Sequence, residues 1–180
     1  MNREIKPGPR HGLVIVNTGR GKGKTTAALG LMVRALGRGF RVIMFQFIKS
    51  RKHLYGEHGM AERLGVEIIP LGDGFTWESQ NIEFDRSLAA EGWARCKTAI
   101  ESGAYDMVVL DELTYLLKYG WLELDEVLDV LANRNPDMHV VITGRDAPAG
   151  LIEESDLVSE ISEIKHPFKS GIRAQAGIEL

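Results

Sequence analysis

The stretch from Leu13 to Thr26, LVIVNTGRGKGKTT, constrains the fold of this chain more than any other part of the sequence. A short β-branched run enters a glycine-rich turn, and a helical pattern begins at Lys24-Thr25. A strand, a glycine-rich turn and a helix in this order form the context of a phosphate-binding loop, or P-loop. Glycines let backbone N–H groups converge on phosphate oxygens, and the helix N-terminus adds partial positive charge. The stretch therefore predicts nucleotide binding.

Each residue type in this loop has an expected role toward ATP. Lys24 would bridge phosphates, and the Thr25 hydroxyl would ligate Mg²⁺. The pattern departs from G-x-x-x-x-G-K-[ST] at its first position, where Thr18 stands and glycine follows at Gly19. The full set of residues expected to bind ATP is Thr18, Gly19, Arg20, Gly21, Lys22, Gly23, Lys24, Thr25 and Thr26.

The rest of the chain alternates short apolar runs with longer amphipathic ones. The predicted strands are Leu13–Val16, Val42–Phe47, Val66–Ile69, Met107–Leu110, Val140–Ile142 and Leu157–Ile161. The predicted helices are Thr25–Leu36, Ile82–Ile100 and Leu124–Leu131, while 50–60 is expected to be a loop. Strands that alternate with helices imply right-handed crossovers and a parallel sheet. The fold class predicted is α/β, a P-loop (RecA-like), mainly parallel sheet with helices on both faces.

Two further strands are expected to end beside the phosphate site. The run MVVLDE ends in Asp111 and Glu112, and either carboxylate is a candidate ligand of Mg²⁺, directly or through water. The run VVITGR ends in Arg145, which is expected to point at the triphosphate. Ligands of such folds bind at this carboxyl edge of the sheet.

Composition limits the class of protein. A length of 180 residues indicates one domain, expected at 12–180 after a flexible N-terminal segment at 1–11. A net charge of −3 argues against a broadly basic nucleic-acid-binding surface. No apolar run approaches the roughly 18 residues of a membrane span, so no membrane partner is expected. A single cysteine, Cys96, fits a reducing compartment, and a cytoplasmic location is expected.

The motifs so far leave the reaction open. The sequence has no Asn-Lys-x-Asp run, which disfavours a GTPase. A small-molecule kinase would transfer the γ-phosphoryl group and produce ADP. A RecA-like module would use ATP binding to gate association with nucleic acid or protein, and the net charge gives it little support.

Six segments taken together resemble the ATP:corrinoid adenosyltransferases of the cob(I)yrinic acid a,c-diamide and cob(I)alamin type. They are TGRGKGKTT from Thr18, FQFIK from Phe45, GFTW from Gly74, VLDELTY from Val109, ITGR from Ile142 and AQAGIE from Ala174. The resemblance implies transfer of the 5′-deoxyadenosyl group of ATP to Co(I) of a corrinoid, with release of triphosphate, in adenosylcobalamin biosynthesis or salvage. It also implies that ATP lies reversed relative to other P-loop enzymes.

The resemblance assigns roles to particular residues. Lys24 and Arg145 would act on the triphosphate as catalytic residues, and Thr25 and Glu112 would be Mg²⁺ partners. Phe75 and Trp77, two positions apart, would form an apolar wall against the corrin and exclude its lower axial ligand. The implied partners are ATP, the corrinoid, an electron donor such as a reduced flavoprotein, and a second copy of the chain in a homodimer.

Overall fold

The computed structural model describes residues 11–50, 55–72 and 82–179. Two sets of predictions lie outside the described residues, namely the N-terminal segment up to residue 10 and the aromatic pair Phe75 and Trp77.

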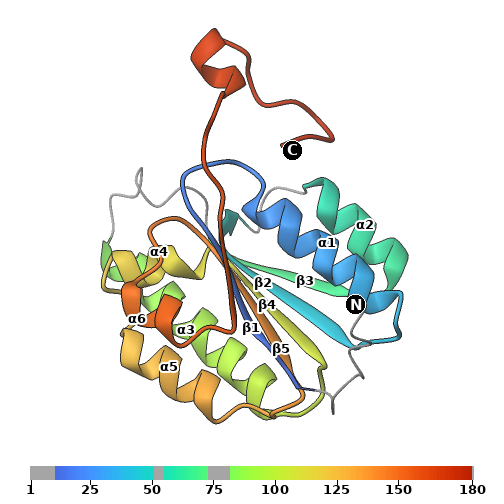
Figure 1. Cartoon of the computed structure of the whole chain (residues 1–180), viewed down its shortest axis with the longest axis vertical. Coiled ribbons are helices and arrows are strands. Elements are labelled where there is room, and N and C mark those ends of the chain that lie inside the picture. Colours follow the sequence, from blue (N-terminus) through green and yellow to red (C-terminus); the bar gives the residue numbers. More distant parts are fainter. Residues whose placement is uncertain (1–10, 51–54, 73–81, 180) are drawn as a thin grey trace, which may run out of the picture.

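A single six-stranded sheet forms the centre of the molecule (Figure 1), and every strand pairing in it is parallel. The strand order is β3-β2-β4-β5-β1-β6. The strands are β1 (Val14–Thr18), β2 (Val42–Ser50), β3 (Glu67–Gly72), β4 (Met107–Asp111), β5 (His139–Thr143) and β6 (Leu157–Glu160). Since all strands run the same way, their carboxyl ends meet at one edge, where ligands of open α/β sheets bind.

Helices cover both faces of this sheet (Figure 1). On one face lie α1 (Lys24–Leu36) and α2 (Gly56–Leu64), which share an apolar cluster that includes Met32, Met44 and Ala61. On the other face lie α3 (Ile82–Glu101), α4 (Leu113–Lys118), α5 (Leu124–Ala132) and α6 (Ala149–Glu153). A short 3-10 helix, η2 (Pro167–Ser170), follows in the C-terminal segment.

The predicted α/β class, six strands and three long helices are confirmed, with shifts of a few residues at their ends. The expectation of a loop over 50–60 is wrong in its second half, because α2 begins at Gly56. On α3, Phe84 is 50% exposed, whereas Trp93 and Cys96 are buried against the sheet. Across the described residues, no helix has the length and apolar character needed to span a membrane.

Candidate active site at the carboxyl edge of the sheet

The predicted phosphate loop joins β1 to α1 at the carboxyl edge of the sheet. Its backbone turns through the left-handed region at Gly19, where φ is 94°. A Cβ at this position would stand 2.5 Å from the Ile161 carbonyl oxygen, so only glycine fits beside the chain that follows β6. The N–H of Gly21 donates to the same carbonyl at 2.7 Å. Ile161, which directly follows β6, thus supports the loop. The N-terminus of α1 faces the position expected for the phosphates.

Lys24, the first residue of α1, is folded back over this loop. Its Nζ donates to the carbonyl oxygens of Gly19 at 2.9 Å and Gly21 at 2.7 Å. The side chain is only 8% exposed. Burial, and after it the positive charge of Arg145, lowers the pKa of Lys24. An anion would stabilise this ammonium group, which is the role expected of a P-loop lysine toward triphosphate.

Asp111, at the end of β4, is fully buried beneath the loop. Its Oδ1 accepts hydrogen bonds from the hydroxyls of Thr25, at 2.9 Å, and Thr143, at 2.6 Å. Burial raises the pKa of the Asp111 carboxyl, and these hydrogen bonds oppose the shift. The expected proximity of the P-loop threonine and the acidic strand end is therefore confirmed.

Glu112 follows directly and is held in an uncommon backbone conformation. Its φ is 64°, in the left-handed region, and its N–H donates to Thr143 Oγ1 at 2.9 Å. Burial, with the neighbouring Asp111 charge second, raises the pKa of Glu112 to about 7. Two adjacent carboxylates and a threonine hydroxyl are the hard oxygen donors that Mg²⁺ prefers. The chemistry of this donor set fits the predicted magnesium ion.

Arg145 lies in the loop after β5, and its side chain is exposed. Its carbonyl oxygen accepts a hydrogen bond of 2.7 Å from Thr114 Oγ1 on α4. The charge of Arg145 adds to the effect of burial in lowering the pKa of Lys24, and it partly opposes the rise in the pKa of Glu112. Lys24, Glu112 and Arg145, which follow β1, β4 and β5, are therefore close enough for their charges to interact. Among them, Arg145 is the one exposed to solvent.

The other predicted loop residues take different positions. Arg20, Lys22 and Thr26 are exposed, and Lys22 forms an ion pair with Glu179 of the C-terminal segment. Thr18 is buried, and its hydroxyl accepts the N–H of Ala147 at 3.2 Å. These side chains surround the loop, whereas Lys24 and Thr25 are directed into the site.

Sequence reasoning assigned no role at the phosphate site to four side chains: Thr143 and Gln46, which contact Asp111, and Glu57 and His58, which contact Gln46. A signal was present for two of them. Gln46 interrupts the apolar run of β2, and Thr143 ends the apolar run of β5, so each is a polar residue at the carboxyl edge of a buried strand. Buried polar side chains require hydrogen-bond partners, which marks such positions as parts of a polar network.

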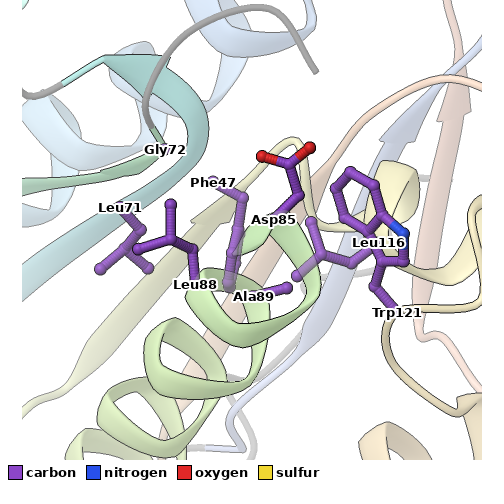
Figure 2. A pocket seen from close by; sticks show the side chains of 8 residues that line it. All are labelled: Phe47, Leu71, Gly72, Asp85, Leu88, Ala89, Leu116 and Trp121. Carbon is purple, nitrogen blue, oxygen red and sulfur yellow. The ribbon is translucent and has the colours of Figure 1, made fainter. Parts of the chain in front are cut away.

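A small apolar cleft lies at the same edge, between β2, β3, α3 and α4 (Figure 2). Its apolar lining includes Phe47, Leu71, Leu116 and Trp121. Figure 2 also shows the Asp85 carboxylate above these side chains. One oxygen of this carboxylate is buried and has no hydrogen-bond partner among the residues that the structure describes. The cleft combines apolar surface with an acceptor.

In this parallel α/β sheet the first strand, β1, carries a phosphate loop, and β4 ends at the same edge, where Asp111 and Glu112 supply two carboxylates. These features define a P-loop nucleotide-binding protein. Residues 10–180 match the family described as ATP:corrinoid adenosyltransferase BtuR/CobO/CobP. The chain belongs to this family, and the resemblance noted in its motifs is confirmed.

Curated relatives agree with this membership. A corrinoid adenosyltransferase of Escherichia coli (strain K12) is 44% identical over 168 residues, which are 93% of this chain and 85% of that protein. Corrinoid adenosyltransferase CobA of Salmonella typhimurium has the same identity and coverage. Among solved structures, flagellar accessory protein FlaH from Methanocaldococcus jannaschii has a TM-score of 0.55 at 13% identity, and the match covers 85% of this chain and 72% of that chain. This last similarity shows the fold alone.

Proposed function

We propose that this chain transfers the 5′-deoxyadenosyl group of ATP to Co(I) of a corrinoid and releases triphosphate, in adenosylcobalamin biosynthesis or salvage. The observation that carries the proposal is the buried ammonium group of Lys24, which lies on the loop carbonyls next to the Arg145 charge. Both cations belong to a chain whose family is named for this reaction.

The chemistry requires stabilisation of a leaving group more than it requires a protein nucleophile. Co(I) attacks C5′ of the ribose, and the C5′–O bond breaks with its electron pair going to the triphosphate oxygen. Negative charge therefore grows on the triphosphate in the transition state. Lys24, Arg145 and the loop amides are the groups of this chain that would stabilise it.

We propose that Mg²⁺ binds with the triphosphate at Thr25, Asp111 and Glu112. The ion would neutralise charge on the leaving group. The mutual repulsion that helps to raise the pKa of Glu112 supports this role, because a divalent cation relieves it.

Phe75 and Trp77 are proposed to form the wall against the corrin. Gly72, the last described residue before the segment that holds them, lines the apolar cleft at the carboxyl edge (Figure 2). Apolar surface at the same edge of the sheet as the phosphate loop suits a ligand with a large, mostly apolar ring system.

The remaining proposals concern the whole chain. Residues 12–180 would form one adenosyltransferase domain, and a reduced flavoprotein would serve as electron donor. A cytoplasmic location is supported by Cys96, a buried free thiol. A homodimer is supported by exposed apolar side chains in the C-terminal segment, where Ile164 is 95%, Phe168 75% and Ile178 80% exposed.

An anaerobic assay tests the proposed reaction. The purified protein is mixed with Mg-ATP and a chemically reduced Co(I) corrinoid, and the visible spectrum is followed. The expected result is a light-sensitive adenosylcorrinoid whose formation requires ATP. An unchanged spectrum, together with ADP formation when small hydroxyl compounds are offered, would instead favour a kinase.

A further inference from the structure

The side chain of Gln46 lies at the centre of a hydrogen-bond network that reaches from β4 to α2. Gln46 is fully buried, and its backbone pairs in register with that of Asp111 on the neighbouring strand. Its Nε2 donates to Asp111 Oδ2 at 3.3 Å and to Glu57 Oε1 at 3.1 Å. Its Oε1 contacts His58 Nε2 at 2.8 Å. Both N–H groups and the carbonyl of this amide are therefore used.

The protonation of His58 fixes the direction of the amide. His58 Nδ1 accepts the backbone N–H of Tyr55 at 3.1 Å, so in the neutral ring Nε2 carries the proton. That proton is donated to Gln46 Oε1. The amide must then turn its NH₂ group toward the two carboxylates. A neutral donor placed between Asp111 and Glu57 separates two negative charges that would otherwise repel.

Lys49 completes the support on the side of α2. It forms an ion pair with Glu57, and its Nζ stands 4.4 Å from the centre of the Tyr55 ring. Lys49 thereby balances the negative charge of the Glu57 carboxylate that accepts the hydrogen bond from Gln46. Two consecutive contacts, from Glu57 to Gln46 and from Gln46 to Asp111, connect α2 to β4, the strand that ends at the phosphate site.

This network determines how Asp111 is oriented. Its Oδ1 is held by Thr25 of α1 and Thr143 of β5, and its Oδ2 is held by Gln46 of β2. The two oxygens are thus engaged from opposite sides. A carboxylate held in this way cannot rotate without breaking a buried hydrogen bond.

We infer that Gln46 is a positioning residue for the adenosyl transfer: it fixes the Asp111 carboxylate beside Thr25, and α2 holds Gln46 through Glu57 and His58. The inference rests on the proposed role of Asp111 at the magnesium–triphosphate site. Groups that orient a metal-binding carboxylate contribute about 10- to 100-fold to metal affinity or activity.

The test compares ATP binding with and without Mg²⁺ in Gln46→Met, which keeps the length of the side chain and removes the amide. Titration calorimetry gives Kd for ATP in excess Mg²⁺ and in EDTA. We expect Kd in Mg²⁺ to rise about 10-fold or more, while Kd in EDTA stays that of the unaltered protein. Met44→Leu is the matched control, because Met44 is also fully buried on β2 and packs in the apolar cluster below α1 and α2.

Two variants of His58 keep the inference testable if Gln46→Met does not fold. His58→Leu removes the donor to Gln46 Oε1 and should weaken binding in Mg²⁺ by a smaller factor in the same direction. His58→Gln can donate from its own amide and should restore part of that loss.

Other results would overturn the inference. Equal losses of affinity in Mg²⁺ and in EDTA would mean that Gln46 only packs. ATP affinities of Gln46→Met equal to those of the unaltered protein would mean that Gln46 does not orient the Asp111 carboxylate. If Mg²⁺ does not strengthen ATP binding even in the unaltered protein, the inference fails together with the magnesium site. Formation of adenosylcorrinoid is measured separately and would still decide the proposed reaction.

Discussion

Lys24 shows most directly what a single residue contributes to this site. In the structure its ammonium group satisfies two loop carbonyls, and it must exchange these for phosphate oxygens when ATP binds. Burial and the Arg145 charge lower its pKa, so an incoming anion is favoured. The loop therefore holds the lysine ready next to the position expected for the triphosphate.

Replacing Lys24 with alanine should slow adenosyl transfer by about 100- to 1,000-fold, because a charge aimed at the leaving group is lost from the transition state. Steady-state rates with Co(I) corrinoid and saturating Mg-ATP measure the effect. Arg34→Ala is a suitable control, since Arg34 is an exposed cation ten residues further along the same helix. A Lys24→Ala rate close to that of the control would remove the P-loop from the mechanism.

His58 should make the stability of the protein depend on pH. Burial lowers its pKa, the Lys49 charge adds to the shift, and Glu57 opposes it. Near pH 6 the unfolded chain then binds more protons at this position than the folded protein. Stability from His58 is present above the unfolded pKa of about 6.5 and is lost as pH falls below it.

Urea unfolding at several pH values measures this dependence. The unaltered protein should lose more free energy of unfolding than His58→Gln between about pH 7.5 and pH 5. Parallel curves for the two proteins would show that His58 titrates alike in the folded and unfolded states.

At the scale of elements, the site depends on how α4 is joined to the end of β5. Thr114 of α4 donates to the carbonyl of Arg145, and Thr143 accepts the N–H of Glu112. Gly144 between them has a φ of 142°, and a Cβ there would stand 1.9 Å from Thr114 Oγ1. Thr114 of α4 can approach the chain after β5 this closely only because residue 144 is glycine.

Gly144→Ala should therefore destabilise the protein by about 2 kcal/mol or more and displace Arg145. Gly30→Ala is the matched control, because Gly30 lies inside α1 with open space around it. That change should stabilise the protein by about 0.5 to 1 kcal/mol. Thermal unfolding of both variants checks the contrast, and equal stabilities would contradict the described contact between Gly144 and Thr114.

The six strands and the helices α1, α3 and α5 could be predicted from the sequence, and α2 and α4 could not. The β-branched strands and the apolar faces of α1, α3 and α5 give clear periodic patterns. By contrast, α2 contains Gly56 and Gly59 and has no Ser, Thr, Asp or Asn before its first residue. Its beginning is fixed by the His58 side chain, which accepts the Tyr55 N–H. A helix six residues long such as α4 spans too few turns to show a period.

The same distinction holds within the site. Lys24, Thr25, Asp111 and Glu112 follow from a motif and from strand ends, and the structure brings them together. Gln46 reaches Asp111 through strand register, which sequence periodicity does not determine. Tertiary contacts of this kind arise only when the sheet is assembled.

In the whole molecule, the proposed reaction uses two regions of one sheet edge. The phosphate loop and the carboxylates would hold the triphosphate, and the apolar region near Gly72 would hold the corrin.

Trp77→Ala tests the proposed corrin-binding region. Turnover should fall much more when the assay starts from Co(II) with a reductant than when it starts from Co(I), because the proposed aromatic wall would exclude the lower axial ligand and so make Co(II) easier to reduce. Equal losses in the two assays would mean that Trp77 serves only packing.

The identity of the phosphate product distinguishes adenosyl transfer from phosphoryl transfer. Phosphorus NMR of an anaerobic reaction with limiting Mg-ATP and excess Co(I) corrinoid distinguishes triphosphate from ADP. Attack at C5′ predicts one triphosphate for each adenosylcorrinoid formed, and no ADP. Formation of ADP in place of triphosphate would mean that the site transfers a phosphoryl group, and the account would be wrong.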